Sequence, residues 1–277
     1  MLSRIYRSLL NQRSFDFEWL IIDDGSTDDT KKVVEQFTDN GKVPVKYYKK
    51  DNGGKHTAHN MAVKLAKGDY FMCLDSDDWL SDRAIEFVFN ALVSCSSHEG
   101  LIAYKADTKG RLLSDSFPTN LLCAGTVELS LKYKCNGEFT LVYPTGVLRE
   151  YPFPVFEGEK FITECVLYDR ISDICNMRLI PNVICICEYQ EEGYSNNTNL
   201  LMKNNPIGFS VYFRQRIQCQ TNLLNKIIIA GKYNCFRMIA GYNTPTYVQD
   251  DSATGLIRVT RPLGVIFWLY YKAFRGF

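Results

Sequence analysis

The chain has 277 residues, of which 46% are hydrophobic, and this is enough to bury a substantial core. Lys and Arg number 32 against 31 Asp and Glu, so the overall charge argues against a nucleic-acid binder held by a broad basic surface. No apolar stretch approaches the ~20 residues that span a bilayer, and residues 1–12 predict an amphipathic helix rather than a signal peptide. We therefore expect a soluble globular protein whose functional charge is local.

The ten cysteines indicate a reduced, cytosolic protein, because several of them lie inside apolar runs of a large core. Cys185 and Cys187 occupy alternate positions of a predicted strand and therefore face the same side. Neither a second cysteine pair nor a histidine cluster accompanies them to complete a zinc site. We expect these two thiols to serve in packing.

The first hundred residues alternate strand and helix patterns, which is typical of a parallel sheet covered by helices. Strands are predicted at 18–24, 43–49 and 69–75, and helices at 26–40 and 57–68. From about residue 100 to 195 the strands are shorter and the loops longer, and a helix is predicted at 157–173. Residues from about 200 onward are mainly helical, for example at 208–229.

Acidic residues follow two of the predicted strands directly. Asp23 and Asp24 end the first strand, and Asp75, Asp77 and Asp78 end the third. Ligands bind at the carboxyl ends of strands in an open parallel sheet, so these groups are expected to share one rim. Three uses are open for the second group: oxygen ligands for a divalent cation, an acid and base pair, or a turn that caps backbone amides.

A magnesium or manganese ion held by one or two carboxylates is commonly completed by substrate phosphates. The loop DNGGKH follows the second predicted strand and could offer backbone amides and Lys55 to a diphosphate. A flexible turn is the alternative reading of its two glycines.

Two stretches, FEWLIIDDGSTDDT and NGGKHTAHNMAVKLAKGDYFMCLDSDD, resemble the signature of the large inverting family 2 of glycosyltransferases. The resemblance is strong over residues 1–82 and continues more loosely to about residue 195. It implies an α/β fold of GT-A type, with a mostly parallel sheet flanked by helices and a Rossmann-like nucleotide-binding half. It also implies a nucleotide-sugar-binding half at 1–105 and an acceptor-binding half of the same domain at 106–195. The helical pattern that follows predicts a helical C-terminal extension at 196–277.

Members of that family transfer a sugar from a nucleoside diphosphate to an acceptor hydroxyl, with inversion at the anomeric carbon. The resemblance implies nucleotide-binding roles for Asp23, Asp24, Lys55 and Asp75, with Asp24 contacting the base or the ribose. Asp75 and Asp77 match the family's Asp-x-Asp motif, and Asp78 lies beside them. Asp77 is the expected direct ligand of Mg²⁺ or Mn²⁺, which would act as a Lewis acid on the departing diphosphate.

The family's catalytic base usually comes from a Glu-Asp pair that opens a helix in the second half. In this sequence the matching stretch is FITECVLYDRI, in which Glu164 takes the place of the family's Asp and a threonine precedes it. Glu164 is therefore the candidate catalytic base, with Glu157 and Glu159 as rivals. A carboxylate at a solvated helix entry is the alternative for each.

The sequence departs from the family at its start, because the family's first apolar strand is absent and the chain opens with the helix that follows it. In the GT-A fold this strand lies between the strand that ends at Asp23 and the one that ends at Asp75. We therefore expect that the strands ending at Asp23 and Asp75 each lack a hydrogen-bond partner along one edge. We also expect that the chain is a truncated form of an otherwise functional type of enzyme.

These features predict a metal-dependent inverting glycosyltransferase that moves a sugar from a nucleoside diphosphate sugar, with UDP as the expected nucleotide, to a polysaccharide or lipid-linked acceptor. A non-catalytic nucleotide-sugar-binding remnant is one alternative, favoured by the absent strand and the altered Glu-Asp pair. A nucleotidyltransferase is another, although it would be expected to carry a richer Gly/Lys/Arg loop than DNGGKH.

The final stretch, 261–277, combines basic and aromatic residues and suits an interfacial helix on an anionic membrane. The alternative is a terminal helix docked on the core or on a partner subunit. We expect a cytoplasmic protein that contacts the inner face of the membrane peripherally.

Overall fold

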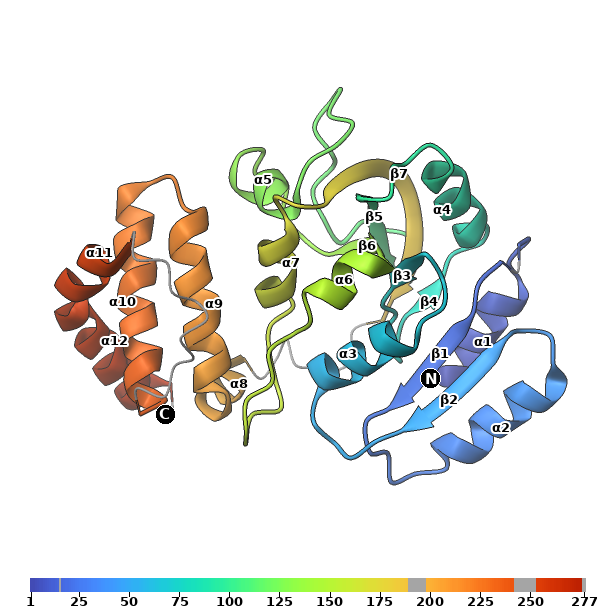
Figure 1. Ribbon diagram of the computed structural model, residues 1–277, viewed down its shortest axis with the longest axis horizontal. Helices are drawn as coiled ribbons and strands as arrows, with labels where there is room; N and C mark the ends of the chain where they lie inside the picture. Colours follow the sequence, from blue (N-terminus) through green and yellow to red (C-terminus); the bar gives the residue numbers. More distant parts are fainter. Residues whose placement is uncertain (15, 189–197, 242–252, 276–277) are drawn as a thin grey trace. The chain divides into compact units, whose positions relative to one another are not determined.

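The computed structural model describes residues 1–14, 16–188, 198–241 and 253–275 (Figure 1). The chain divides into two compact units. The first consists of Met1–Asn52, Thr57–Pro152 and Ile171–Gln190, and the second of Gly53–His56, Phe153–Arg170 and Glu191–Phe277. The predicted boundaries at residues 105 and 195 concern the roles of chain segments, and they stay a prediction.

The first unit begins with alternating helices and strands, as the sequence pattern predicts. The elements are α1 (Leu2–Leu10), β1 (Trp19–Asp23), α2 (Thr30–Asn40), β2 (Val45–Lys49) and α3 (Lys55–Leu65, of which Lys55 and His56 group with the second unit). β1 and β2 are parallel, with Trp19 opposite Val45 and Asp23 opposite Lys49. Their carboxyl ends therefore lie side by side, and each leads into a polar loop.

The other strands of the first unit form a five-stranded sheet in the order β3-β6-β5-β7-β4. They are β3 (Tyr70–Met72), β4 (Trp79–Leu80), β5 (Glu99–Asp107), β6 (Phe139–Pro144) and β7 (Asn176–Cys187), and the helices among them are α4 (Ala84–Leu92), α5 (Thr126–Leu131) and α6 (Thr145–Glu150). Only β5 and β7 are parallel in this sheet, and its other three pairs are antiparallel. The expectation of a mostly parallel sheet is thus corrected in this detail, because β6 runs antiparallel to both of its neighbours, β3 and β5, and β4 runs antiparallel to β7.

Between residues 16 and 188, no strand pairing joins the two-stranded sheet to the five-stranded sheet. β1 pairs with β2 alone and β3 with β6 alone. In the described part of the chain, β1 and β3 therefore each have a strand neighbour along one edge and none along the other, as expected.

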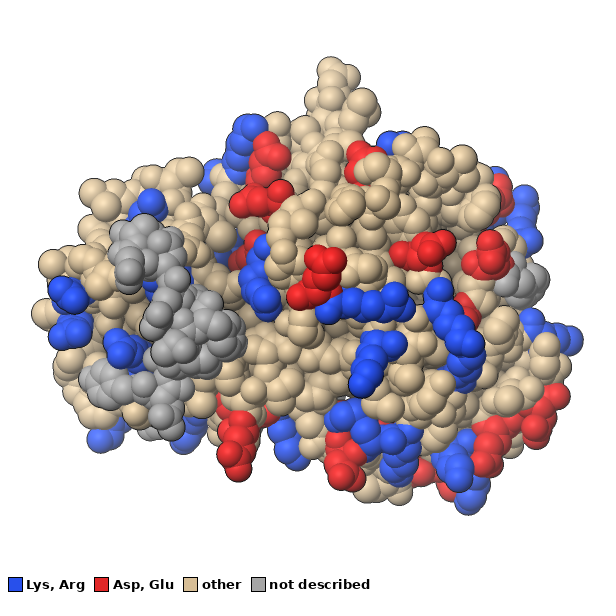
Figure 2. Space-filling view, viewed as in Figure 1, with Lys and Arg blue, Asp and Glu red and all other residues tan. Residues whose placement is uncertain are grey.

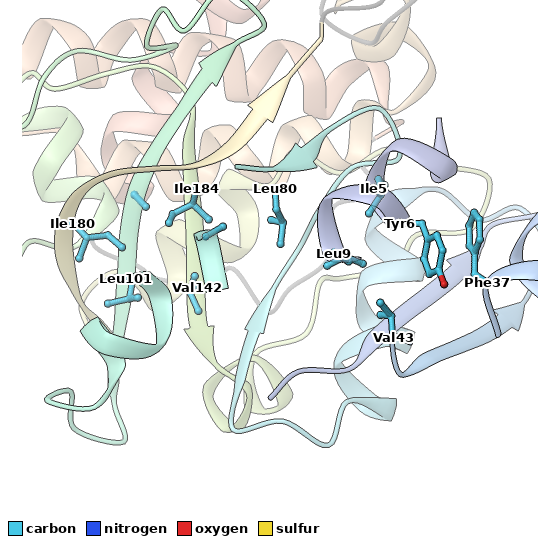
Figure 3. Packing of buried hydrophobic residues seen from close by; sticks show 12 residues of the cluster. Ile5, Tyr6, Leu9, Phe37, Val43, Leu80, Leu101, Val142, Ile180 and Ile184 are labelled. Atoms are coloured by element: carbon cyan, nitrogen blue, oxygen red, sulfur yellow. The ribbon is translucent and has the colours of Figure 1, made fainter. Parts of the chain in front are cut away.

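One apolar core nevertheless serves both sheets of the first unit (Figure 3). Ile5, Tyr6 and Leu9 of α1 belong to the same buried cluster as Leu101 of β5 and Val142 of β6. The amphipathic pattern of residues 1–12 explains this, because it places these apolar side chains on one face of the helix.

Polar contacts tie α1 to the segment that follows the acidic turn at 75–78. Ser8 Oγ accepts a hydrogen bond from Leu80 N at 3.2 Å. The side chain of Gln12, which is buried, donates to Ser81 O at 2.9 Å and accepts from Ile85 N at 3.0 Å. Helix α1 therefore fixes the chain directly behind the turn.

The second unit is mainly helical. Its elements are α7 (Cys165–Ile171, of which Ile171 groups with the first unit), α8 (Thr198–Asn204), α9 (Pro206–Cys219), α10 (Leu223–Ile239), α11 (Thr254–Val259) and α12 (Arg261–Phe274). α10 packs against both α9 and α12, and their core includes Phe213, Phe236 and Tyr271 (Figure 1). Across the described residues, none of the helices combines the length and apolar character needed to cross a membrane.

Two predicted helices differ in extent. The helix predicted at 157–173 begins only at Cys165, because the preceding loop is held elsewhere: Lys160 N and Phe161 N both donate to Asn205 Oδ1 at 2.9 Å. The helix predicted at 208–229 is two helices, since Gln220 is extended and Asn222 starts α10 by accepting from Asn225 N.

Candidate active site

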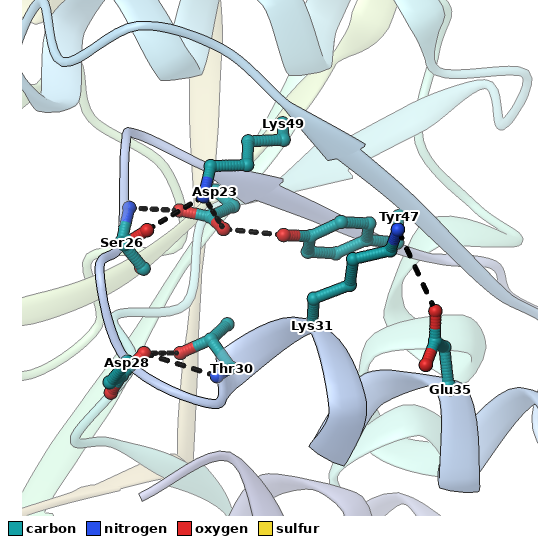
Figure 4. A network of polar contacts seen from close by, with 8 residues as sticks. All are labelled: Asp23, Ser26, Asp28, Thr30, Lys31, Glu35, Tyr47 and Lys49. Atoms are coloured by element: carbon teal, nitrogen blue, oxygen red, sulfur yellow. Dashed lines mark hydrogen bonds and ion pairs between the residues drawn. The ribbon is translucent and has the colours of Figure 1, made fainter.

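The turn after β1 is organised around a buried carboxylate (Figure 4). The side chain of Asp23 is 1% exposed and accepts hydrogen bonds from the Tyr47 hydroxyl and from Ser26 N, the latter at 2.6 Å. Burial acts to raise the pKa of Asp23, but the hydrogen bonds from Tyr47 and Ser26 outweigh it and hold the pKa below its ordinary value. Asp23 therefore serves as a charged anchor of the turn.

Asp24 is the more accessible member of this pair, with 22% of its side chain exposed. Its carboxylate forms an ion pair of 2.5 Å with Lys50 Nζ, which follows β2. Gly25 brings the two loops together, because its φ of +91° suits glycine and a Cβ there would lie 2.9 Å from Asn52 N. The predicted convergence of the first two strand ends is thus observed.

The turn between β3 and β4 holds the three aspartates. Asp78 N donates to Asp75 O at 3.1 Å, which closes the turn. The side chains of Asp75 and Asp77 are partly exposed, whereas that of Asp78 is 8% exposed. The turn therefore separates two accessible carboxylates from one that is buried.

Lys105, near the end of β5, offsets the negative charge of the buried Asp78 carboxylate. Its Nζ lies 3.3 Å from Asp78 Oδ2. Burial acts to lower the pKa of Lys105, but nearby thiols and carboxylates, Asp78 and Asp75 among them, outweigh it and raise the pKa above its ordinary value. Sequence reasoning missed this residue, although a single lysine inside the apolar strand pattern GLIAYKAD was an available signal.

The two strand cysteines lie in the same cluster. β4 pairs antiparallel with β7, and Cys185 Sγ lies 3.7 Å from Asp78 Oδ2. The ligand atoms of Asp78, Cys185 and Cys187 all fall within 4.8 Å of one another, a spacing that would also allow a soft cation. With Lys105 already supplying a positive charge there, the contacts fit the predicted packing role of the two thiols.

In the second unit, Glu164 directly precedes α7 and accepts from Tyr168 N through its carbonyl, so it opens that helix as predicted. Its carboxylate pairs with Lys55 Nζ at 2.7 Å, and 49% of the side chain is exposed. Gly54 makes this approach feasible, since a Cβ there would lie 1.8 Å from Lys160 O. Lys55 and Glu164, which the sequence placed in separate roles, are thus direct neighbours.

The rivals of Glu164 lie in different surroundings. Glu159 is buried and accepts from Ile207 N and Gly208 N, at 2.6 and 2.7 Å, at the beginning of α9. These bonds satisfy helix amide groups that would otherwise lack a partner, which is a structural role. Glu157 is exposed.

Comparison with known proteins places this site in a family context. Residues 1–96 match the model of Glycosyl transferase family 2. The poly(ribitol-phosphate) beta-N-acetylglucosaminyltransferase TarP of Staphylococcus aureus (strain N315) is 37% identical over 114 residues, which are 40% of this chain and 34% of TarP. Chondroitin synthase of Pasteurella multocida (strain Pm70) is 44% identical over 85 residues, or 31% of this chain and 9% of that protein. The matches thus cover about a third or less of these relatives.

Solved structures resemble a larger part of the chain. S. aureus TarS 1-349 in complex with UDP-GlcNAc has a TM-score of 0.62 at 16% identity, over 94% of this chain and 75% of that one. GalNAc-T7 with UDP, GalNAc and Mn²⁺ has a TM-score of 0.59 at 12% identity, over 94% of this chain and 51% of that one. At these identities the likeness concerns the fold, and it confirms the predicted α/β fold of GT-A type.

We predict that Tyr47→Phe will weaken the anchor of the Asp23 turn. The pKa of Tyr47 is raised to about 12, by burial and by the bond to Asp23, so the folded state retains a proton that the unfolded chain releases near pH 10. This contribution to stability is complete below pH 10 and is lost between about pH 10 and 12. Tyr47→Phe should therefore be less stable than the wild type near neutral pH, and the difference should shrink over that alkaline range.

The measurement is urea unfolding at several pH values, with Tyr48→Phe as the matched control on the same strand. Equal stability of Tyr47→Phe and wild type near neutral pH would contradict the anchoring role.

Proposed function

Residues 1–96 of this chain belong to glycosyltransferase family 2, and we propose that the chain transfers a sugar from a nucleoside diphosphate sugar to an acceptor hydroxyl with inversion. The observation that carries the proposal is the construction of the two acidic turns after β1 and β3. Each contains one buried, compensated aspartate, Asp23 or Asp78, and presents accessible carboxylates beside it. Such carboxylates fit a site that needs a cation before it can hold an anionic diphosphate.

In this proposal Asp24 binds the base or the ribose, and Asp75 and Asp77 hold Mg²⁺ or Mn²⁺ against the diphosphate. Carboxylate oxygens are the ligands that these hard ions prefer, and the side chains of Asp75 and Asp77 are more accessible than that of Asp78. When bound, the metal supplies Lewis-acid stabilisation of the leaving diphosphate. The contacts of Asp78 favour a supporting role, through Lys105, over direct metal binding.

UDP is the nucleotide we propose, because it is present in the TarS and GalNAc-T7 structures named above. The acceptor we propose is a polysaccharide or a lipid-linked glycan. The name of TarP refers to poly(ribitol-phosphate) and that of the chondroitin synthase to a polysaccharide, and these two polymers support a polymeric acceptor. We further propose peripheral contact with the cytoplasmic face of a membrane through residues 261–277, where a lipid-linked acceptor would be found.

Glu164 is the proposed catalytic base, and its place at the start of α7 beside Lys55 supports this role. The carboxylate is held by an ion pair yet remains about half exposed, so an acceptor hydroxyl can approach it. The function of Lys55 in the proposal is twofold: it orients Glu164, and it contributes positive charge near the diphosphate.

Calorimetric titration of UDP, with and without Mn²⁺, tests the donor site. We expect Mn²⁺-dependent binding to the wild type, weakened at least about tenfold in Asp77→Ala because a metal ligand is removed. Asp39→Ala is the matched control, since Asp39 is exposed on α2 and should leave binding unchanged.

The donor-site assignment would be wrong if the folded wild type did not bind UDP, or if Asp77→Ala bound UDP as tightly as the wild type. Consumption of a nucleoside triphosphate in place of a UDP-sugar would favour the nucleotidyltransferase alternative. UDP binding without turnover of any UDP-sugar would favour the non-catalytic remnant.

Glu164→Gln separates catalysis from binding. We expect the release of UDP from its sugar donor to slow by about 10²–10⁴-fold, the usual contribution of a general base, while UDP affinity stays at the wild-type value. The measurement is UDP release across a panel of UDP-sugars, with and without acceptor oligosaccharides. Glu157→Gln is the control, and an equal loss in that variant or full activity in Glu164→Gln would refute the assignment of the base.

A further inference from the structure

Charge is distributed unevenly along this chain. Residues 196–277 contain ten Lys and Arg and two acidic residues, Asp250 and Asp251, which gives a net charge of +8. The whole chain carries +1, so residues 1–195 carry −7. On the face shown in Figure 2, the described surface over α11 and α12 displays Lys and Arg but neither Asp nor Glu.

Exposed apolar side chains gather in the same part of the molecule. Of the 17 large hydrophobic residues that are exposed in the described chain, ten lie between residues 198 and 275. Half of these ten form a row on α12: Val265, Ile266, Leu269, Tyr270 and Phe274. Their spacing places them on one side of the helix, where Ile266 is 60% exposed and Phe274 is 75% exposed.

The opposite side of α12 is the one that packs into the unit. Gly264 and Tyr271 are buried there, and a Cβ on Gly264 would lie 2.5 Å from Asn234 Cβ on α10. Tyr271 contacts Phe236 with ring centroids 5.6 Å apart. Because this close packing fixes the rotation of α12 about its own axis, the exposed apolar row points away from the core of the unit.

Basic residues stand at both ends of the apolar row. Arg258 and Arg261 precede it and Lys272 and Arg275 follow it, and all four are exposed. The ammonium group of Lys272 lies 5.2 Å from the centre of a Trp268 ring, and the Arg275 guanidinium lies 5.8 Å from that of Tyr270. Aromatic rings flanked by cations are typical of helices that lie in the headgroup region of a bilayer.

We propose that this face of α11 and α12 docks on an anionic phospholipid bilayer, with the apolar row inserted between headgroups and the basic residues on lipid phosphates. The inference extends the membrane contact of the proposed function by naming the side chains that enter the bilayer and those that meet lipid phosphates, and it does not depend on sugar transfer. A second copy of the chain fits the face less well, because it would bring two strongly positive surfaces together.

Flotation with lipid vesicles tests the proposal on the full chain. We expect the wild type to float with vesicles that mix phosphatidylglycerol and phosphatidylcholine, to stay behind with phosphatidylcholine alone, and to dissociate as salt is raised. Ile266→Asn/Leu269→Asn should lower the vesicle partition at least about tenfold, since both side chains would enter the bilayer. Arg261→Gln/Lys272→Gln should lower it by about fivefold for each charge removed.

Leu122→Asn is the matched control, because Leu122 is 76% exposed in the first unit and should not affect flotation. Unchanged melting temperatures would show that the variants fold. The proposal is overturned if the wild type ignores anionic vesicles or if Ile266→Asn/Leu269→Asn floats like the wild type. It is also overturned if sedimentation velocity shows a self-associated wild type that the same variant converts to monomers, without vesicle binding by either.

UDP titration of the two α12 variants keeps this inference separate from the proposed function. Both should bind UDP and Mn²⁺ like the wild type, whereas Asp77→Ala should float like the wild type. A loss of flotation in Asp77→Ala would mean that the metal site supports membrane binding, contrary to the proposal.

Discussion

Compensation of buried carboxylates is the constraint on which the arrangement of this molecule depends. Two like charges about 4 Å apart repel by about 4 kcal/mol at an effective dielectric of 20, so clustered aspartates destabilise the fold unless they are offset. The chain offsets Asp23 with hydrogen bonds from Tyr47 and Ser26, and Asp78 with the Lys105 ammonium. The partly exposed carboxylates of Asp24, Asp75 and Asp77 are the ones that a ligand can reach.

The same contacts explain why the strands take their positions. Tyr47 reaches Asp23 because β1 and β2 are parallel and in register, and Lys105 reaches Asp78 because β7 lies between β5 and β4. Ser8 of α1 and Gln12, which follows this helix, then hold the segment after Asp78. The two acidic turns are therefore consequences of long-range pairing, and substitution of a strand residue distant in sequence can disturb either of them.

This dependence decides how much the sequence could predict. The strand that ends at Asp23 and the amphipathic helix at the start follow from local periodicity and were correctly placed. The helix that Glu164 opens was implied by the family resemblance, whereas the third predicted strand ends at Met72 and not at Asp75. The antiparallel course of β6 and the burial of Asp78 were not predictable in this way, since both depend on contacts between residues far apart in the sequence. The roles of Glu159 and Lys105 were missed for the same reason: the partners are 48 and 27 residues away.

The division of charge shows why a near-zero total is a poor guide to the partners of a protein. A sum of +1 argues against a broad nucleic-acid-binding surface, yet it conceals a segment of −7 joined to one of +8. An acidic segment repels a nucleoside diphosphate, so the proposed donor binding there would require a cation to reverse the local sign, which is the role proposed for Asp75 and Asp77. A basic helical segment requires no such reversal, because an anionic membrane is already its complement. The proposed metal dependence of donor binding and the proposed salt-sensitive membrane binding would thus both follow from one charge distribution, and each should be removable without the other.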